Sequence, residues 1–122
     1  MSKIVLWVSD LDAQIDFYSR LFDVADVYRD AGFADVTDGT NSVLLHKLPA
    51  EYSAATPLTA QLKTQDEVAI KPVFTVASIA DAKARVAHTF GSFSERSDSY
   101  GAFTYQDAVD PEGNVIQLQQ AN

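Results

Sequence analysis

Few side chains of this sequence could perform chemistry on a bound molecule. The chain has two histidines, His46 and His88, and no cysteine, so thiolate metal sites, cysteine nucleophiles and disulfides are excluded. It has no glycine-rich phosphate loop, and no serine has a recognisable base beside it. His88 falls late in a predicted helix and is expected at the surface. His46 falls in a predicted strand and is the better candidate for a ligand contact, although a single histidine cannot hold a divalent ion at a catalytic site.

Composition narrows the function classes further. The chain has 122 residues, of which 47% are hydrophobic and 21% charged, as in soluble globular proteins. A net charge of −8 argues against DNA or RNA as a partner. The negative charge could attract a cationic ligand, although a role in solubility is the simpler explanation of this charge. No apolar run approaches the roughly 20 residues of a membrane span, and the first residues are too short for a secretory signal. We therefore expect a cytoplasmic protein with neither membrane nor nucleic-acid partners.

The elements that must position these residues form an internal repeat. A predicted strand over residues 3–8 leads into a helix that Ser9 or Asp10 can cap. The pattern returns 68 residues later, where a strand over 73–76 leads into a helix starting at Ser78. Each predicted helix carries an apolar stripe at helical spacing. The stripes consist of Leu11, Ile15, Tyr18 and Phe22 in the first helix, and of Ile79, Ala82, Val86 and Phe90 in the second, which Gly91 is expected to end.

Three strand-like segments follow each helix, so each half reads β-α-β-β-β and the sequence predicts an α+β fold. These segments are 24–29, 32–37 and 42–48 in the first half, and 93–96, 102–106 and 114–119 in the second. We predict a single domain, 1–122, made of module 1 (1–48), a linker (49–68) and module 2 (69–122).

Two motifs in this pattern are specific when they occur together. They are VSDLDAQIDFY, at the first strand and helix, and DPEGNVIQL, at the last turn and strand. With them the chain resembles the vicinal oxygen chelate superfamily, which includes glyoxalase I, bleomycin-resistance proteins, fosfomycin-resistance enzymes and extradiol dioxygenases. The resemblance implies two modules that curl into half-barrels around a cleft, and a homodimer. In the catalytic members, His and Glu side chains hold a divalent metal in that cleft.

The family's metal-ligand positions fall on unsuitable residues here. The expected His, His and Glu match Lys3, Lys71 and Gln117. An ammonium has no lone pair to donate, and the amide oxygen of Gln is a weak ligand. The fourth position lies within Val43-Leu44-Leu45-His46, where His46 is a candidate. We therefore predict no metal, no cofactor and no catalytic residue.

Strand alternation sorts the residues that would face the cleft. If the two lysines and Gln117 point inward, every second residue of the same strands does so too, while Ile4, Leu6, Phe74, Ile116 and Leu118 pack under the helices. The predicted ligand-binding residues are Trp7, Lys3, Val5, His46, Lys71, Val73, Thr75 and Gln117. Phe33, Phe103 and Tyr105 are further candidates whose faces the pattern does not settle. Lys3 and Lys71 could meet an anion, or could lie at strand ends in solvent.

Three functions are compatible with these features. The first is a metal-free small-molecule-binding protein that sequesters an antibiotic or an aromatic metabolite. The second is a divalent-metal-dependent lyase or dioxygenase of the glyoxalase type, which would require ligands at other positions. The third is a catalytically inactive partner or regulatory module, with a cleft filled by its own side chains. Whether the cleft closes within one chain or across a dimer is left open by the sequence.

Overall fold

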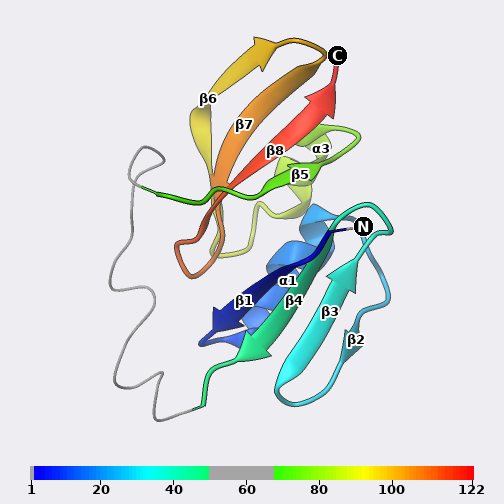
Figure 1. Cartoon of the computed structure of the whole chain (residues 1–122), viewed down its shortest axis with the longest axis vertical. Helices are drawn as coiled ribbons and strands as arrows, with labels where there is room; N and C mark the ends of the chain where they lie inside the picture. The colour runs from blue at the N-terminus through cyan, green and yellow to red at the C-terminus, as the bar shows by residue number, and fades with distance from the viewer. Residues whose placement is uncertain (1, 50–67) are drawn as a thin grey trace.

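The computed structural model describes residues 2–49 and 68–122, which form two βαβββ modules (Figure 1). The first module consists of β1 (Ile4–Val8), α1 (Leu11–Leu21), β2 (Tyr28–Arg29), β3 (Phe33–Thr37) and β4 (Ser42–Lys47). The second consists of β5 (Val73–Thr75), α3 (Ile79–Arg85), β6 (Ser92–Tyr100), β7 (Phe103–Val109) and β8 (Val115–Ala121). The predicted α+β fold is confirmed. The predicted linker lies almost entirely outside the described residues.

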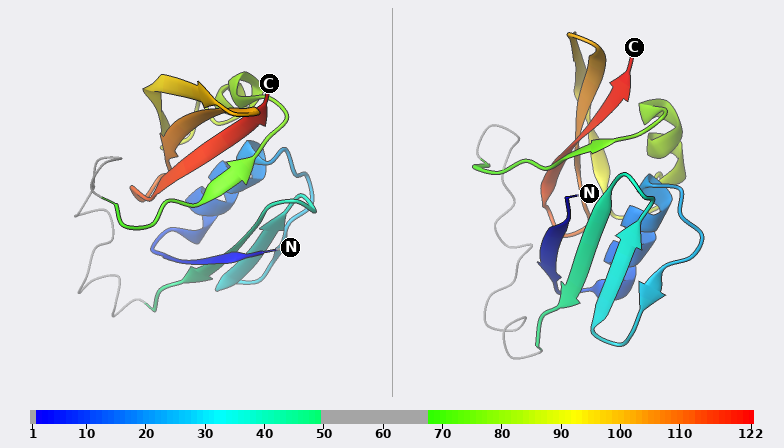
Figure 2. Two further views of the ribbon diagram at one scale, coloured as in Figure 1. Left: turned by 45° about the horizontal axis from the view of Figure 1, so that its top comes forward. Right: turned by 45° about the vertical axis from the view of Figure 1, so that its right-hand side comes forward.

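The two modules build their sheets in the same way. The strand order is β1-β4-β3-β2 in one sheet and β5-β8-β7-β6 in the other. In each sheet the first strand pairs in parallel with the last, and the other pairings are antiparallel. Helix α1 covers one face of the first sheet and α3 one face of the second (Figure 2). We call the opposite face of each sheet, which no helix of the described residues covers, its helix-free face.

Both helices begin where the sequence predicts. The Asp10 side chain accepts a hydrogen bond from the Ala13 backbone N–H at 3.0 Å, and Ser78 accepts one from the Asp81 N–H at 3.1 Å. A side-chain oxygen at this position satisfies one of the backbone donors that a helix start leaves unpaired. The local sequence therefore determines both starts.

The predicted end of the second helix is wrong. Helix α3 stops at Arg85, and Phe90 is 88% exposed instead of completing the apolar stripe. After the helix, Gly91 lies close against the first module: a Cβ atom there would be 2.3 Å from Cε2 of Phe17. This close approach is a tertiary contact, so helical periodicity alone could not predict it.

Strand lengths also differ from the prediction. Strand β2 is limited to Tyr28–Arg29, whereas the sequence pattern predicts a strand over 24–29. Strand β6 extends over Ser92–Tyr100, beyond the predicted 93–96. Its exposed sequence lacks apolar alternation, and it is held by pairing with β7, with an irregularity between Phe93 and Ser97. A polar edge strand has no core face to leave a hydrophobic pattern in the sequence.

The buried core runs across both modules. The rings of Tyr18 and Phe22 in α1 pack against Phe74 of β5, with centroid distances of 6.3 and 5.1 Å. At the end of α1, Arg85 of α3 donates hydrogen bonds to the carbonyl groups of Arg20 and Leu21 at 2.6 and 2.9 Å. These carbonyls belong to the last turn of α1, where acceptors lack helical partners. The second module thus caps the helix of the first.

The DPEGN turn before β8 makes a second link between the modules. The carboxylate of Glu112 accepts hydrogen bonds from the backbone N–H groups of Ser9 and Asp10, at 2.8 and 3.0 Å. A negative charge is favourable at a helix N-terminus, where α1 begins. The turn therefore both launches the last strand and binds the first module. No helix in the described part of the chain is long and apolar enough to cross a membrane.

Candidate functional site

The helix-free faces carry the side chains that strand alternation predicts. In β1, Val5 and Trp7 are 50% and 53% exposed, while Ile4 and Leu6 pack against the core. In β5, Val73 is exposed and Phe74 buried. In β8, Ile116 and Leu118 belong to the core, whereas Gln117 and Gln119 are partly exposed. The predicted division between core and helix-free face is confirmed for these residues, whereas Val115, predicted on the helix-free face of β8, is buried as well.

The strand registers locate the fourth metal-ligand position. Gln117 of β8 pairs with Val73 of β5, and Leu44 of β4 pairs with Val5 of β1. Val5 and Val73 are equivalent in the repeat, so Leu44 is the counterpart of Gln117. His46 lies two residues further along β4, opposite Trp7. His46 was a candidate for the fourth metal-ligand position, and this prediction is wrong. The cross-strand register places Leu44, an aliphatic residue, at that position.

Each lysine at a matched position has a carboxylate partner in its own module. Lys3 Nζ lies 3.6 Å from Oδ2 of Asp35, and Lys71 Nζ lies 2.7 Å from Oδ2 of Asp107. The two carboxylates are equivalent: Asp35 pairs with Leu44 across the sheet, and Asp107 pairs with Gln117. Both modules thus repeat the same Lys–Asp ion pair. An anionic ligand would have to compete with these carboxylates for the ammonium groups.

Sequence reasoning misses Asp35 and Asp107. Sequence context suggests only a turn-forming role for Asp107, yet it lies within β7. The repeat could have indicated both residues, because both are aspartates on the middle antiparallel strand of their module. Their role depends on the register between strands, which the sequence alone does not supply.

These residues do not fit a divalent metal ion. The three matched positions offer two ammonium groups and one amide, and the nearest carboxylates already bind the ammonium groups. Across residues 2–49 and 68–122, no three His, Cys, Asp or Glu side chains lie close enough together to hold a metal. The donor groups at the matched positions therefore do not support metal-dependent chemistry.

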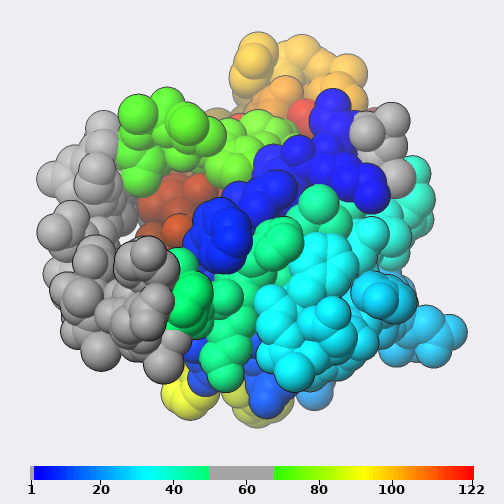
Figure 3. Space-filling view, turned by 60° about the horizontal axis from the view of Figure 1, so that its bottom comes forward, coloured from blue at the N-terminus to red at the C-terminus, as the bar shows by residue number. Residues whose placement is uncertain are grey.

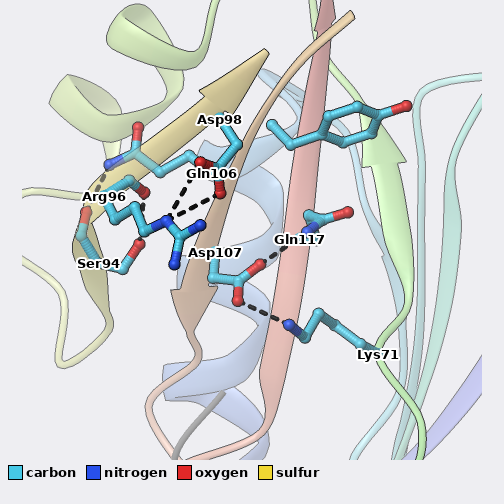
Figure 4. Close-up of a pocket in the computed structure, with 8 residues that line it drawn as sticks. Lys71, Ser94, Arg96, Asp98, Gln106, Asp107 and Gln117 are labelled. Carbon is cyan, nitrogen blue, oxygen red and sulfur yellow. Dashed lines mark hydrogen bonds and ion pairs between the residues drawn. The ribbon is translucent and has the colours of Figure 1, made fainter. Parts of the chain in front are cut away.

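A cavity of about 390 Å³ opens on the helix-free face of the second sheet (Figure 4). Asp107 lies at the centre of this cavity. Its Oδ2 accepts a hydrogen bond from the Lys71 ammonium group at 2.7 Å, and its Oδ1 accepts one from Nε2 of Gln117 at 2.9 Å. Two predicted site residues are thus brought together by one that was not predicted. The residues lining this cavity, called here the polar pocket, are Lys71, Ser94, Arg96, Asp98, Tyr105, Gln106, Asp107 and Gln117.

The remaining pocket contacts come from strands β6 and β7. Arg96 Nε lies 3.1 Å from the Asp98 carboxylate, and Gln106 Nε2 donates to the Ser94 carbonyl at 2.6 Å. Desolvation raises the pKa of Tyr105 above its ordinary value of 10.0, and the neighbouring Tyr100 raises it further, so the Tyr105 phenol is protonated at neutral pH. The pocket is rich in hydrogen-bonding groups, with Tyr105 as its one ring.

The helix-free face of the first sheet is aromatic instead. The ring centroids of Trp7 and His46 are 4.8 Å apart, those of His46 and Phe33 are 4.9 Å apart, and Tyr28 lies 6.2 Å from Phe33. These four residues form an aromatic row across the strands. Figure 3 shows atoms of β1, β4 and β3 side by side on one face of the molecule, with the start of the second module next to β1. Such a row can stack against a planar ring in a ligand.

The other predicted site residues lie apart from the polar pocket. Lys3 is on the first sheet with Asp35. Thr75 accepts a hydrogen bond from Nε2 of Gln119 at 2.7 Å, and its backbone is bound by Asn41 of the first module. It lines a larger groove, of about 640 Å³, between the modules. Of the eight predicted residues, the structure therefore places Lys71 and Gln117 in the polar pocket and Trp7 and His46 in the aromatic row.

Comparison with known proteins agrees with this architecture. The profile of the Glyoxalase/Bleomycin resistance protein/Dioxygenase superfamily matches residues 1–118. The chain belongs to this superfamily. Among curated proteins, none matches the sequence significantly.

Several solved structures share the fold at low sequence identity. A glyoxalase/bleomycin resistance protein/dioxygenase family enzyme from Burkholderia phytofirmans has a TM-score of 0.69 and 15% identity, over 99% of this chain and 98% of that one. The fosfomycin resistance protein FosX from Listeria monocytogenes has a TM-score of 0.68 and 13% identity, over 100% and 93%. An integron cassette protein from Vibrio cholerae has a TM-score of 0.63 and 23% identity, over 100% and 94%. At these identities, the similarity establishes the fold alone.

Proposed function

We propose that this protein is a metal-free small-molecule-binding member of the superfamily. The observation that carries the proposal is the repeated ion pair of Lys3 with Asp35 and Lys71 with Asp107, at the positions where catalytic members hold their metal. The helix-free face therefore carries hydrogen-bonding groups, but the carboxylates at these positions bind lysines and do not form a set of metal ligands. The polar pocket and the aromatic row are the two surfaces to which the ligand binds.

The aromatic row supports binding of a ligand that contains a planar ring, such as an antibiotic or an aromatic metabolite. Trp7 is the only tryptophan of the chain and is 53% exposed, so its fluorescence reports on the row without interference from another indole. A ring that stacks on Trp7 changes the environment of the indole and should change its emission. Sequestration without chemistry would be detected as stoichiometric binding that leaves the ligand unaltered.

The first experiment is a divalent-ion series. Native-purified protein should contain no stoichiometric metal, and Mn²⁺, Ni²⁺ or Zn²⁺ should not raise its melting temperature, because only a ligand that binds the native state stabilises it. A stoichiometric metal in the natural protein would instead support an enzyme of the glyoxalase type.

The second experiment is a fluorescence titration with antibiotics and aromatic metabolites. A saturable change in Trp7 emission, with the ligand recovered unchanged, is the expected result. The variant His46→Ala should weaken this binding, because it removes the ring that lies against Trp7 at 4.8 Å. His88→Ala is the matched control, since His88 lies on the exposed surface after α3. Equal binding by both variants would place the ligand away from the aromatic row.

A further inference from the structure

The polar pocket contains two cationic and two anionic side chains. Lys71 and Asp107 form one pair, at 2.7 Å, and Arg96 and Asp98 form the other, at 3.1 Å. Their formal charges sum to zero, so the pocket as a whole favours neither a cation nor an anion. The local charge therefore differs from the net charge of −8 of the whole chain.

The two pairs lie at different depths. The side chains of Lys71 and Asp107 are 27% and 14% exposed, whereas those of Arg96 and Asp98 are 83% and 61% exposed. The first pair is therefore the more buried of the two, and both pairs line the pocket (Figure 4). Arg96 contacts Asp98 through Nε, and its terminal Nη groups have no partner among the described residues. At least two guanidinium donors are thus available to a ligand.

The charge of the ligand follows from the cost of leaving a partly buried charge unpaired. A ligand with a single charge that binds to one member of the Lys71–Asp107 pair leaves the other without a partner, which is unfavourable where water is partly excluded. A ligand with both charges can give each member a new partner. Its carboxylate would replace Asp107 beside Lys71 and reach Arg96, and its ammonium would replace Lys71 beside Asp107. All charges then stay compensated.

We propose that the polar pocket binds a small zwitterion that carries an ammonium group and a carboxylate, such as an amino acid or a dipeptide. This inference rests on the proposed small-molecule-binding function and names a ligand class for it. The volume of about 390 Å³ equals roughly a dozen water volumes of ~30 Å³ each, which is enough space for an amino acid or a small dipeptide.

The test is a set of matched ligands measured by calorimetry and thermal shift on the full chain. The zwitterions are the common amino acids and L-alanyl-L-alanine. For each one that binds, the N-acetyl derivative retains only the negative charge, the amide retains only the positive charge, and the doubly capped form has neither. Either single cap should weaken binding about tenfold or more, because a charged hydrogen bond is lost and a protein charge is left unpaired.

Two variants connect the binding to the pocket. Arg96→Gln, at an exposed position, should fold normally and weaken zwitterion binding about tenfold, and Asp107→Asn should abolish it. Arg20→Gln is the matched control, because Arg20 pairs with Asp16 on the surface of α1 and not in the pocket. Circular dichroism establishes that Asp107→Asn is folded. If it is not, Arg96→Gln alone decides the assignment.

Each outcome has one meaning. Binding that is lost on capping and weakened by Arg96→Gln supports the zwitterion site. No binding by any zwitterion of the set, equal binding by the capped forms, or equal binding by Arg96→Gln overturns it. A different ligand that still changes Trp7 emission would leave the proposed function intact while the zwitterion site fails. A stoichiometric metal would contradict the proposed function itself.

Discussion

Tyr18 and Asp110 meet across the boundary between the two modules, where the tyrosine hydroxyl donates a hydrogen bond to Oδ2 of the carboxylate at 2.8 Å. Both side chains are buried, with exposed fractions of 0% and 2%. Asp110 also accepts hydrogen bonds from the backbone N–H groups of Glu112 and Asn114 and from the Asn114 amide. The carboxylate is therefore held both by its own turn and by the helix of the other module.

Replacing Tyr18 tests this link, at neutral and at alkaline pH. Burial raises the pKa of Tyr18 well above its ordinary value of 10.0, and the neighbouring Asp110 raises it further. Stability from the protonated phenol is therefore fully present below about pH 10 and is lost as the pH rises through the folded-state pKa. Tyr18→Phe should cost about 1–3 kcal/mol in urea unfolding at pH 7, and should remove most of the alkaline loss of stability seen in the natural protein. Tyr28→Phe, which changes an exposed residue, should change neither quantity.

Gly91 should not tolerate a side chain. An alanine Cβ there would lie 2.3 Å from Cε2 of Phe17 and 2.9 Å from the Val109 carbonyl oxygen. Gly91→Ala should therefore destabilise the protein by about 1–3 kcal/mol, as overpacking commonly does, measured by the urea midpoint. Gly32→Ala is the control, because nothing lies within 4 Å of the added atom. Equal midpoints for the two variants would show that the contact relaxes freely.

Gln14 in α1 is fully buried, and neither polar atom of its side chain has a hydrogen-bond partner among the described residues. Removing an unsatisfied buried amide without changing the side-chain volume should be favourable. Gln14→Met should raise the free energy of unfolding by about 1 kcal/mol. Gln119→Met should not, because the Gln119 amide donates to Thr75. A loss of stability in Gln14→Met would indicate that the amide is hydrogen-bonded in solution.

The two repeated ion pairs should differ in strength. Lys71 and Asp107 are closer together and less exposed than Lys3 and Asp35, at 2.7 against 3.6 Å. Double-mutant cycles with Lys→Gln and Asp→Asn should give a coupling energy of about 1 kcal/mol for the second-module pair and less than about 0.5 kcal/mol for the first. The larger coupling should also persist at higher salt, since partial burial protects it from screening. The reverse order would contradict the packing of the polar pocket.

Much of the fold could be predicted from local sequence pattern. The repeat, both helix starts and the core faces of β1, β5 and β8 agree with the structure, because each depends on residues close together in the chain. The predictions that fail include the helical end at Phe90 and the bounds of β2 and β6. Phe90 precedes Gly91, which lies close against Phe17 of the first module, and β6 pairs with β7 as far as Tyr100.

Some residues of the candidate site could likewise be predicted from local sequence pattern, and others could not. Lys71 and Gln117 could be selected from spacing within a motif, but Asp107, which binds both, could not. Nor could the contact between Trp7 and His46, or the Glu112 carboxylate at the start of α1. Each of these depends on a partner that is remote in the sequence.

The sequence by itself determined which side chains face the core, where the helices begin, and that lysines and glutamine stand at the metal-ligand positions. These properties follow from the two-residue period of a strand and from capping, which act within a few residues. Only the tertiary structure decided that each lysine is neutralised by an aspartate of its own sheet and that the second module caps both ends of α1. The physical reason is that cross-strand register and module docking are set by the packing of the whole core, which brings together residues that no local pattern connects.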